Sequence, residues 1–325
     1  MISKKALFSF VSACVFLAAC GGSSSSSDGS TNVIIDSQAT TTFSLGVSDA
    51  PVDDAVIVAI EIGSIKLINT DETNGKQEVM IDQFTNDMGE VVDSIQVNLL
   101  DHQGTSQLKI IDETQNVTLN VGEYTMELNV IDEGSYVMLD NDATEYAIKV
   151  PSSRLRLGAF MVTENAQQQG EVPAYTIEFD LRQSLVQRGN DPAKNGFIIK
   201  PHGVRIEGAT GSISGLISAE NTNLGACTVY LYEAAPTELG DMFDIEDTTF
   251  AGEVPTATAP IATAKVNDDS TYSIGFVAEG NYTVALFCGV EIDDNVQYDG
   301  LVIPSPEGNM ETVDVVVGQE TTVNF

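Results

Sequence analysis

Three aspartates surround a proline in the stretch SDAPVDDAVIVAIEIGSIKL, residues 48–67. Carboxylates spaced as closely as Asp49, Asp53 and Asp54 are the oxygen donors that a hard cation such as Ca²⁺ prefers. Ca²⁺ takes about six to eight oxygens, however, and this stretch supplies far fewer side chains. The same residues also suit a turn before a strand, because Pro51 fixes its own φ and Asp side chains hydrogen-bond nearby backbone groups. We therefore expect a turn here, with Asp49, Asp53 and Asp54 kept as metal-ligand candidates.

A second pair of candidates is aromatic. Tyr230 and Tyr232 alternate with Val229 and Leu231. If the aliphatic pair faces a core, the tyrosines form a stripe on the opposite face, where rings can stack on a sugar or anchor a protein. The chain has no Trp, which weakens the carbohydrate interpretation. An acidic insertion follows at 236–255, and we expect it to cover the stripe. Tyr230 and Tyr232 remain ligand candidates for an unknown protein or glycan partner.

Motifs for catalysis are missing from the sequence. His102 and His202 lack the neighbouring ligands of a zinc motif, and no C-x-x-C is present. The stretch GSISG at 211–215 has Ile213 where a nucleophile elbow needs Ser. We therefore expect a non-enzymatic protein without a cofactor. A hydrolase is the third alternative, because a fold can bring distant residues together.

The N-terminus is typical of an exported protein. Lys4 and Lys5 precede an apolar stretch at 6–18. This stretch is too short to span a hydrocarbon core, which needs about 20 residues, but it fits the apolar region of a signal peptide. Residues 1–19 are therefore excluded from the fold.

The sequence Leu17-Ala18-Ala19-Cys20 resembles the lipobox of bacterial lipoproteins. The resemblance implies cleavage before Cys20, lipidation of the Cys20 thiol and acylation of the new N-terminus. Several acyl chains on one residue give a stable membrane anchor. In lipoproteins of this kind, Gly21 favours the outer membrane over the inner one. A secreted protein in which Cys20 is incidental is the alternative.

The net charge of −34 excludes nucleic acid as a partner and suits a well-solvated surface. Residues 43–210 hold 11 Lys/Arg against 27 Asp/Glu, whereas residues 211–325 hold Lys265 against 19 acids. All five arginines lie between positions 154 and 205, where we expect them to neutralise carboxylates. This shift predicts a domain boundary near residue 210.

The chain is expected to be all-β. Tyr124, Met126, Leu128 and Val130 alternate with polar residues, and the segments 56–62 and 175–181 repeat that period of two. Turn-forming residues separate many such short segments, which indicates antiparallel sandwiches. We predict a signal peptide at 1–19, a lipidated Gly/Ser-rich tether at 20–42, and β-sandwich domains at 43–210 and 211–325.

The first predicted sandwich resembles the bacterial lipoprotein family called Domain of Unknown Function 4382. The resemblance covers about residues 43–207 and rests on SDAPVDDAVIVAIEIGSIKL, VNLLDHQG, VGEYTMELNV, YAIKVPSSRLRLGAF, EFDLRQSLV and FIIKPHGVRI. It implies a fold and a location but no activity.

The second predicted sandwich resembles the carboxypeptidase regulatory-like domains, which have a transthyretin-like, carbohydrate-binding-like fold. The resemblance rests on GSISGLIS, GACTVYLYE, ATAKVNDDSTYSIGFVAEGNYTVALF and ETVDVVVGQETTVNF. Asp268-Asp269-Ser270 replaces the usual Asp-Gly turn, and the insertion at 236–255 is additional. The resemblance implies an accessory module rather than an enzyme.

Cys227 and Cys288 are the two cysteines left after signal cleavage and lipidation. Each shares a strand face with aliphatic residues, so both thiols are expected to point inward, and disulfides persist outside the cytoplasm. We predict a Cys227–Cys288 disulfide, with two buried free thiols as the alternative.

The leading functional hypothesis is a lipid-anchored outer-membrane protein that acts as a binding or scaffolding module. The runner-up is a surface adhesin or carbohydrate-binding module, with or without dependence on Ca²⁺.

Overall fold

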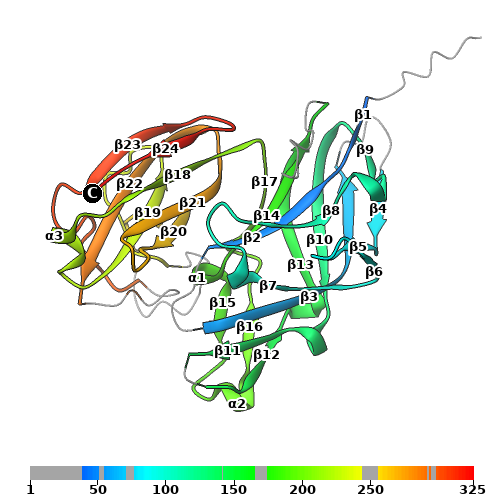
Figure 1. Cartoon of the computed structure of the whole chain (residues 1–325), viewed down its shortest axis with the longest axis horizontal. Helices are drawn as coiled ribbons and strands as arrows, with labels where there is room; N and C mark the ends of the chain where they lie inside the picture. The colour runs from blue at the N-terminus through cyan, green and yellow to red at the C-terminus, as the bar shows by residue number, and fades with distance from the viewer. Residues whose placement is uncertain are drawn as a thin grey trace, which may run out of the picture. The chain divides into compact units, whose positions relative to one another are not determined.

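A computed structural model describes residues 39–50, 55–70, 77–140, 142–164, 174–243, 255–290, 293 and 298–325. Gln38–Phe325 forms one compact unit, shown in Figure 1. The signal peptide, Cys20, most of the tether, Asp53 and Asp54 lie outside the described residues, so the expectations for them stay predictions. No helix in the described part is long and apolar enough to cross a membrane.

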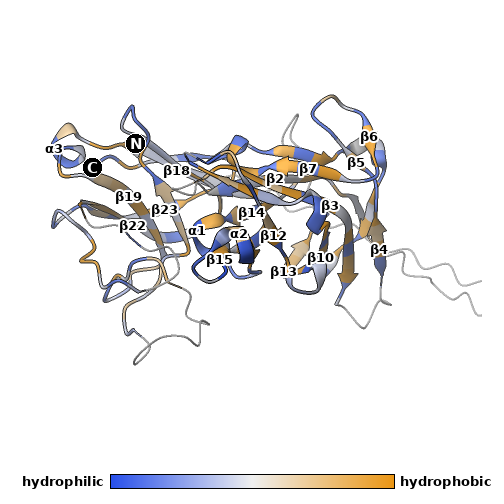
Figure 2. Cartoon of the chain, turned by 90° about the horizontal axis from the view of Figure 1, so that it is seen from below, coloured by the Kyte–Doolittle hydropathy of each residue, from blue (hydrophilic) through white to orange (hydrophobic). Residues whose placement is uncertain are grey.

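The described chain is built mainly from β-strands, which confirms the all-β prediction. The helices there are α1 (Leu181–Ser184), α2 (Pro192–Asn195) and α3 (Ala219–Thr222), and the 3-10 turns are η1 (Leu99–Asp101), η2 (Glu113–Gln115), η3 (Asp132–Gly134) and η4 (Pro151–Ser153). Figure 2 shows hydrophobic residues along strands such as β2 and β19.

Residues 40–208 contain two larger sheets and two strand pairs. The nine-stranded sheet has the order β13-β10-β3-β11-β12-β16-β15, with β4 and β7 also paired to β3. Its strands are β3 (Ala55–Asn69), β4 (Glu78–Ile81), β7 (Ile95–Asn98), β10 (Gly122–Val130), β11 (Tyr136–Leu139), β12 (Glu145–Lys149), β13 (Arg154–Val162), β15 (Leu185–Gln187) and β16 (Phe197–Ile199). The four-stranded sheet has the order β17-β14-β2-β8, with β2 (Leu45–Ala50), β8 (Leu108–Ile111), β14 (Tyr175–Asp180) and β17 (Val204–Gly208). β1 (Thr40–Thr42) pairs with β9 (Thr118–Asn120), and β5 (Phe84–Thr85) pairs with β6 (Val91–Val92).

A bulge at Gly63 shifts the alternation of buried residues along the long strand β3. Asn129 of β10 pairs with Ser64 and Val130 pairs with Ile62, which leaves Gly63 without a partner. The bulge moves the inward positions from even to odd numbers: Val58, Ile60 and Ile62 are buried before it, and Ile65 and Leu67 after it. A Cβ at Gly63 would lie 2.9 Å from the Ile131 side chain, so glycine lets this side chain pack closely against the bulge.

Residues 210–325 form two smaller sheets around a separate core. Their orders are β21-β18-β24 and β20-β19-β22-β23. The strands are β18 (Thr210–Leu216), β19 (Ala226–Glu233), β20 (Ala262–Lys265), β21 (Thr271–Ala278), β22 (Gly280–Gly289), β23 (Met310–Val315) and β24 (Glu320–Thr322). The core includes Val229, Leu231, Val284 and Leu286, whereas the core of the larger sheets is built from residues 43–206.

Two details of the predicted strands were wrong. The alternation at 175–181 placed Thr176, Glu178 and Asp180 in water, but all three are buried because both faces of β14 are covered. The strand also ends at Asp180, since Leu181 begins α1. The expectation of antiparallel sheets holds for most pairs, although β14–β2, β12–β16 and β18–β24 are parallel.

The predicted disulfide between Cys227 and Cys288 is present. The two residues are directly paired across β19 and β22, with their Cα atoms 4.2 Å apart. Both side chains belong to the core of residues 213–325, as their shared faces with aliphatic residues indicated. The bond closes a loop of 61 residues that contains the acidic insertion.

Removing this cross-link should destabilise the protein. In the loop-entropy account, a disulfide across a segment of this length contributes up to about 4 kcal/mol, and the double variant Cys227→Ala/Cys288→Ala should lose about 2–4 kcal/mol. Urea unfolding followed by tyrosine fluorescence measures the difference. A reducing agent should destabilise the wild type by a similar amount and leave the double variant unchanged. An unfolding midpoint of the wild type that is insensitive to reductant would contradict this assignment.

Candidate functional site

Asp49, the first aspartate of the SDAP stretch, lies inside the fold near the end of β2. Its side chain has no exposed surface, and neither carboxylate oxygen has a hydrogen-bond partner. Its backbone is held firmly: the Asp49 N–H donates to the His102 carbonyl at 2.9 Å, and the Gly104 N–H donates to the Asp49 carbonyl at 3.3 Å. The residue is therefore part of a buried strand rather than of an exposed turn.

Burial raises the pKa of Asp49 well above its usual range, and the carboxylates of Glu178 and Asp180 raise it further. These three acids do not converge on one point. Asp49 pairs with Phe179 in the parallel β2–β14 ladder, so its side chain leaves the sheet on the Phe179 side, whereas Glu178 and Asp180 leave on the other. Within the described residues, no group of three or more His, Cys, Asp or Glu side chains is arranged to hold a metal ion. The geometry thus suits retention of protons better than binding of Ca²⁺.

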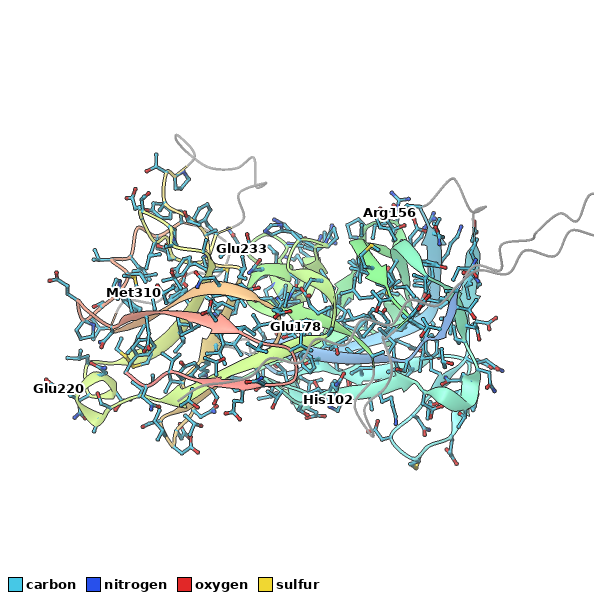
Figure 3. The ribbon with its side chains drawn as sticks, turned by 90° about the horizontal axis from the view of Figure 1, so that it is seen from above. His102, Arg156, Glu178, Glu220, Glu233 and Met310 are labelled. Carbon is cyan, nitrogen blue, oxygen red and sulfur yellow. A yellow bond between two sulfur atoms is a disulfide. The ribbon has the colours of Figure 1, made fainter. Side chains whose placement is uncertain are left out.

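Glu178 and Asp180 were not recognised as site residues from the sequence. Figure 3 shows Glu178 among the strands in the middle of the molecule. Burial raises the pKa of Glu178 to about 8, and the Arg205 guanidinium partly offsets this. Burial also raises the pKa of Asp180 to about 6, against the opposing effects of Arg205 and Arg182. Asp180 caps α1, because its carboxylate accepts from the Gln183 backbone N–H at 3.3 Å and from Gln183 Nε2 at 3.1 Å.

The two candidate tyrosines are fully buried. Tyr230 and Tyr232 leave β19 on the face opposite Val229 and Leu231, as alternation predicts, but both have no exposed surface. Their rings stack with centroids 6.4 Å apart, and the Tyr232 hydroxyl donates to the Gly240 carbonyl at 2.6 Å. Gly240 belongs to the acidic insertion, so at least this part of the insertion covers the stripe. An exposed aromatic platform, which stacking on a sugar requires, is not formed by these rings.

Two carboxylates tie down the loops that cover the tyrosines. Asp293 Oδ2 accepts from the Tyr230 hydroxyl at 2.7 Å, and Asp241 Oδ2 accepts from the Leu301 N–H at 2.8 Å. Burial is the main reason why the pKa of Asp241 is raised to about 6. Burial also raises the pKa of Asp293. Burial likewise raises the pKa of Tyr230, followed by the charge of Asp293.

A groove of about 610 Å³ opens between β13 and β17. Each of these is the terminal strand of its sheet. The groove is lined by residues 158–161 and Thr163, by Tyr175 of β14, and by residues 201–209. Phe160 and Tyr175 meet edge to face with centroids 5.4 Å apart, and the Tyr175 hydroxyl donates to the Met161 carbonyl at 3.2 Å. The hollow thus has an aromatic interior between two strand edges.

Small residues keep the groove open. Gly158 has no partner on β10, where Thr125 pairs with Ala159 and Met126 pairs with Leu157. A Cβ at Gly158 would meet nothing within 4 Å, so this bulge faces open space. On the other wall, a Cβ at Gly208 would lie 2.7 Å from the Tyr175 ring.

Charged groups at the groove are partly paired. Arg205 Nε lies 3.4 Å from Glu207 Oε1 on β17. Farther along β13, Arg156 Nε lies 2.9 Å from Glu127 Oε1 and Arg154 Nη1 lies 3.8 Å from Glu127 Oε2. These pairs agree with the expectation that the arginines neutralise carboxylates, although two guanidinium groups here share one acid. Figure 3 shows Arg156 at the periphery of the molecule.

A family model with the description "Domain of unknown function (DUF4382)" matches residues 40–201. The chain carries a DUF4382 domain. The domain supplies β13 and β14, whereas β17 lies beyond the matched residues. Asp49, Glu178 and Asp180 all belong to the DUF4382 domain, and the groove is built partly from it.

Other comparisons add little to this assignment. A search of curated protein sequences found no match. Among solved structures, GBS52, the minor pilin of Streptococcus agalactiae, is 11% identical with a TM-score of 0.20, and the match covers 87% of this chain and 94% of the pilin. The Bacillus anthracis TIE protein is 10% identical with a TM-score of 0.20, over 89% of this chain and 40% of that protein. The shaft pilin SpaA of Lactobacillus rhamnosus GG is 8% identical with a TM-score of 0.20, over 87% and 97% of the two chains. Similarity at this level carries no argument about function.

The buried acids of the DUF4382 domain should make stability depend on pH. Because the pKa of Glu178 is raised to about 8 in the folded state, its contribution is fully present below its usual value near 4.5 and is lost as pH rises through about 8. Glu178→Gln should therefore show a smaller loss of stability between pH 5 and pH 8.5 than the wild type, by up to about 4 kcal/mol. Urea unfolding at a series of pH values measures this difference.

The exposed Glu145→Gln on β12 is the matched control and should follow the wild-type profile. Parallel stability profiles for the wild type and Glu178→Gln would show that Glu178 is ionised in the folded protein at neutral pH.

Proposed function

We propose that this protein is a non-enzymatic, lipid-anchored binding module of the outer membrane that accepts an extended segment of a partner protein in the groove between β13 and β17. The observation that carries the proposal is the position of the groove between two terminal strands. A terminal strand presents backbone N–H and C=O groups to an incoming chain, which can add to the sheet as a further strand.

The walls of the groove support an extended peptide as the occupant. Gly158 and Ala159 on one side and Gly208 and Ala209 on the other have little or no side chain, so a second backbone can approach closely. The side chains of an added strand alternate, and those that point inward would meet the ring of Phe160 and its neighbours. Backbone pairing would supply affinity, and the aromatic interior would supply selectivity.

Charge favours a partner segment with an acidic residue beside its apolar positions. Arg154 and Arg156 share the single carboxylate of Glu127, which leaves a positive excess on β13. This excess stands out on a chain whose net charge is −34. A partner carboxylate placed there would be drawn to the arginines from a distance and would set the direction of docking.

The membrane anchor is proposed from the N-terminal sequence. Lys4 and Lys5, the apolar stretch at 6–18 and the lipobox-like residues ending at Cys20 form a consistent export and lipidation signal. The Gly/Ser-rich residues 21–31 would then act as a tether that lets the folded part reach a partner away from the lipid surface.

The carbohydrate-binding alternative gains no support from the tyrosine pair, because Tyr230 and Tyr232 are buried and hydrogen-bonded. Protein recognition therefore remains the favoured role.

Filling the groove should abolish peptide binding without unfolding the protein. A side chain at Gly158 would enter open space, so Gly158→Trp should fold normally and block the groove. We expect the wild type to select extended peptides with alternating apolar residues from a random decapeptide display library, and Gly158→Trp to bind the selected peptides at least about tenfold more weakly. Met88→Trp, at an exposed position outside the groove lining, is the control and should bind like the wild type. Selected peptides that bind Gly158→Trp and the wild type equally would refute the groove as the binding site.

Anchoring is tested separately. Cys20→Ser should yield a protein that leaves the membrane fraction and the detergent phase, because no acyl chain can be attached at this position. Cys14→Ser is the matched control, since Cys14 lies in the predicted signal peptide and should not affect anchoring. Detergent-phase partition of Cys20→Ser equal to that of the wild type would exclude a lipid anchor at Cys20, whatever the outcome for the groove.

A further inference from the structure

Two loops of residues 210–325 are joined by reciprocal hydrogen bonds. In each direction, a carboxylate of one loop accepts from backbone N–H groups of the other. One loop connects β19 to β20, and the other connects β22 to β23. Asp241 of the first loop accepts from the backbone N–H groups of Asp299 and Leu301 in the second, at 3.2 and 2.8 Å. In return, Asp293 of the second loop accepts from the Met242 N–H of the first at 3.4 Å. The described residues of both loops lie over the face of β19 that carries Tyr230 and Tyr232.

Each carboxylate uses one oxygen for these hydrogen bonds and leaves the other unsatisfied. Oδ1 of Asp241 and Oδ1 of Asp293 have no hydrogen-bond partner, although the two residues are 0% and 6% exposed. A buried carboxylate oxygen without a partner is costly, and a native structure rarely leaves one in place without a ligand or a proton. The two groups are also neighbours, because Asp293 Oδ2 lies 3.4 Å from the backbone nitrogen of Met242, the residue that follows Asp241.

The two loops are strongly negative in sequence. By sequence, residues 236–255 and 290–300 together contain ten Asp or Glu and no Lys or Arg. The charge of Asp299 raises the pKa of both Asp241 and Asp293. The Arg182 guanidinium lowers the pKa of Asp293 but is not among the causes acting on Asp241. This guanidinium also donates to Thr228 Oγ1 at 3.4 Å. Two neighbouring buried acids that also feel the charge of Asp299 favour a bound positive charge.

We propose that the junction of these two loops is a divalent-cation site for Ca²⁺, with Oδ1 of Asp241 and Oδ1 of Asp293 as its side-chain ligands. Neither segment contains His or Cys, so the donors are hard oxygens, which suit Ca²⁺ rather than zinc or copper. Water and backbone carbonyls complete the coordination, and Ca²⁺ tolerates such irregular sets better than Mg²⁺ does. With two carboxylate ligands, the dissociation constant falls in the range of about 10⁻⁴ to 10⁻³ M that is found in extracellular modules.

The cation would clamp the two loops over Tyr230 and Tyr232 and stabilise this cover. This site is independent of the groove between β13 and β17, so either can fail without the other.

Thermal unfolding and direct binding together test the site. The complete mature protein is freed of metal with a chelator and titrated with CaCl₂, with MgCl₂, or with NaCl at equal ionic strength. We expect Ca²⁺ at ten times its dissociation constant to raise the Tm by about 2–5 °C, and Mg²⁺ and Na⁺ to have little effect. Because the chain has no Trp, Tb³⁺ bound at this junction would be excited through tyrosine. Its luminescence should be displaced by Ca²⁺.

The variants Asp241→Asn and Asp293→Asn keep an oxygen for the hydrogen bonds between the loops and should lose both the Tm shift and the Tb³⁺ signal. Asp268→Asn removes the same charge from an exposed turn of residues 210–325 and should retain both. If either Asn variant fails to fold, Tyr230→Phe leaves the carboxylates in place and should weaken the Tb³⁺ signal while keeping the Ca²⁺ shift. A Ca²⁺ response that survives in Asp241→Asn and Asp293→Asn, or no Ca²⁺ response in the wild type, would overturn the proposal.

Discussion

The covering of β14 on both faces is the constraint on which the rest of this structure depends. One face of the strand carries Tyr175, Ile177 and Phe179 into the core of residues 43–206. The other face carries Glu178 and Asp180, which are equally buried. β14 lies between β2 and β17 in its sheet, so it fixes the place of Asp49 on one side and of the groove on the other (Figure 1). Its last residue, Asp180, caps α1, and Arg182 of α1 reaches Thr228 of β19.

The groove follows from how the two larger sheets end. A sandwich whose terminal strands were covered or closed would have no free edges, whereas β13 and β17 end their sheets beside each other. Exposed edges invite unwanted pairing, and a bulge is one of the devices that natural sheets use against it. The bulge at Gly158 interrupts the regular edge of β13 and widens the hollow. A partner must therefore match an irregular edge, which restricts the choice of partner.

The core face of several strands could be predicted from the sequence. The alternation along β10 placed Tyr124, Met126 and Leu128 correctly in the core, and the shared faces of Cys227 and Cys288 indicated their pairing. The burial of Glu178 could not be predicted, because a period of two tells which residues share a face but not whether a second layer covers the other face. The parallel pairing of β14 with β2 would have indicated it, since such strands are usually covered on both sides, but pairing is not visible in one sequence. The cover over Tyr230 was predicted from the acidic insertion, whereas Asp241 was hidden among the other acids of that insertion.

The two sets of buried acids show how topology decides what the same side chain can do. Glu178 is fixed on β14. Asp49 on the neighbouring strand pairs with Phe179, which points to the opposite face from Glu178, so the two carboxylates cannot meet. A proton is then the simplest way to neutralise each of them. Asp241 and Asp293 come from loops, which are free of the strand period of two and are joined to each other by hydrogen bonds. Their unsatisfied oxygens can therefore share the proposed cation. The backbone N–H groups of each loop that donate to the carboxylate of the other hold the two side chains in place around it.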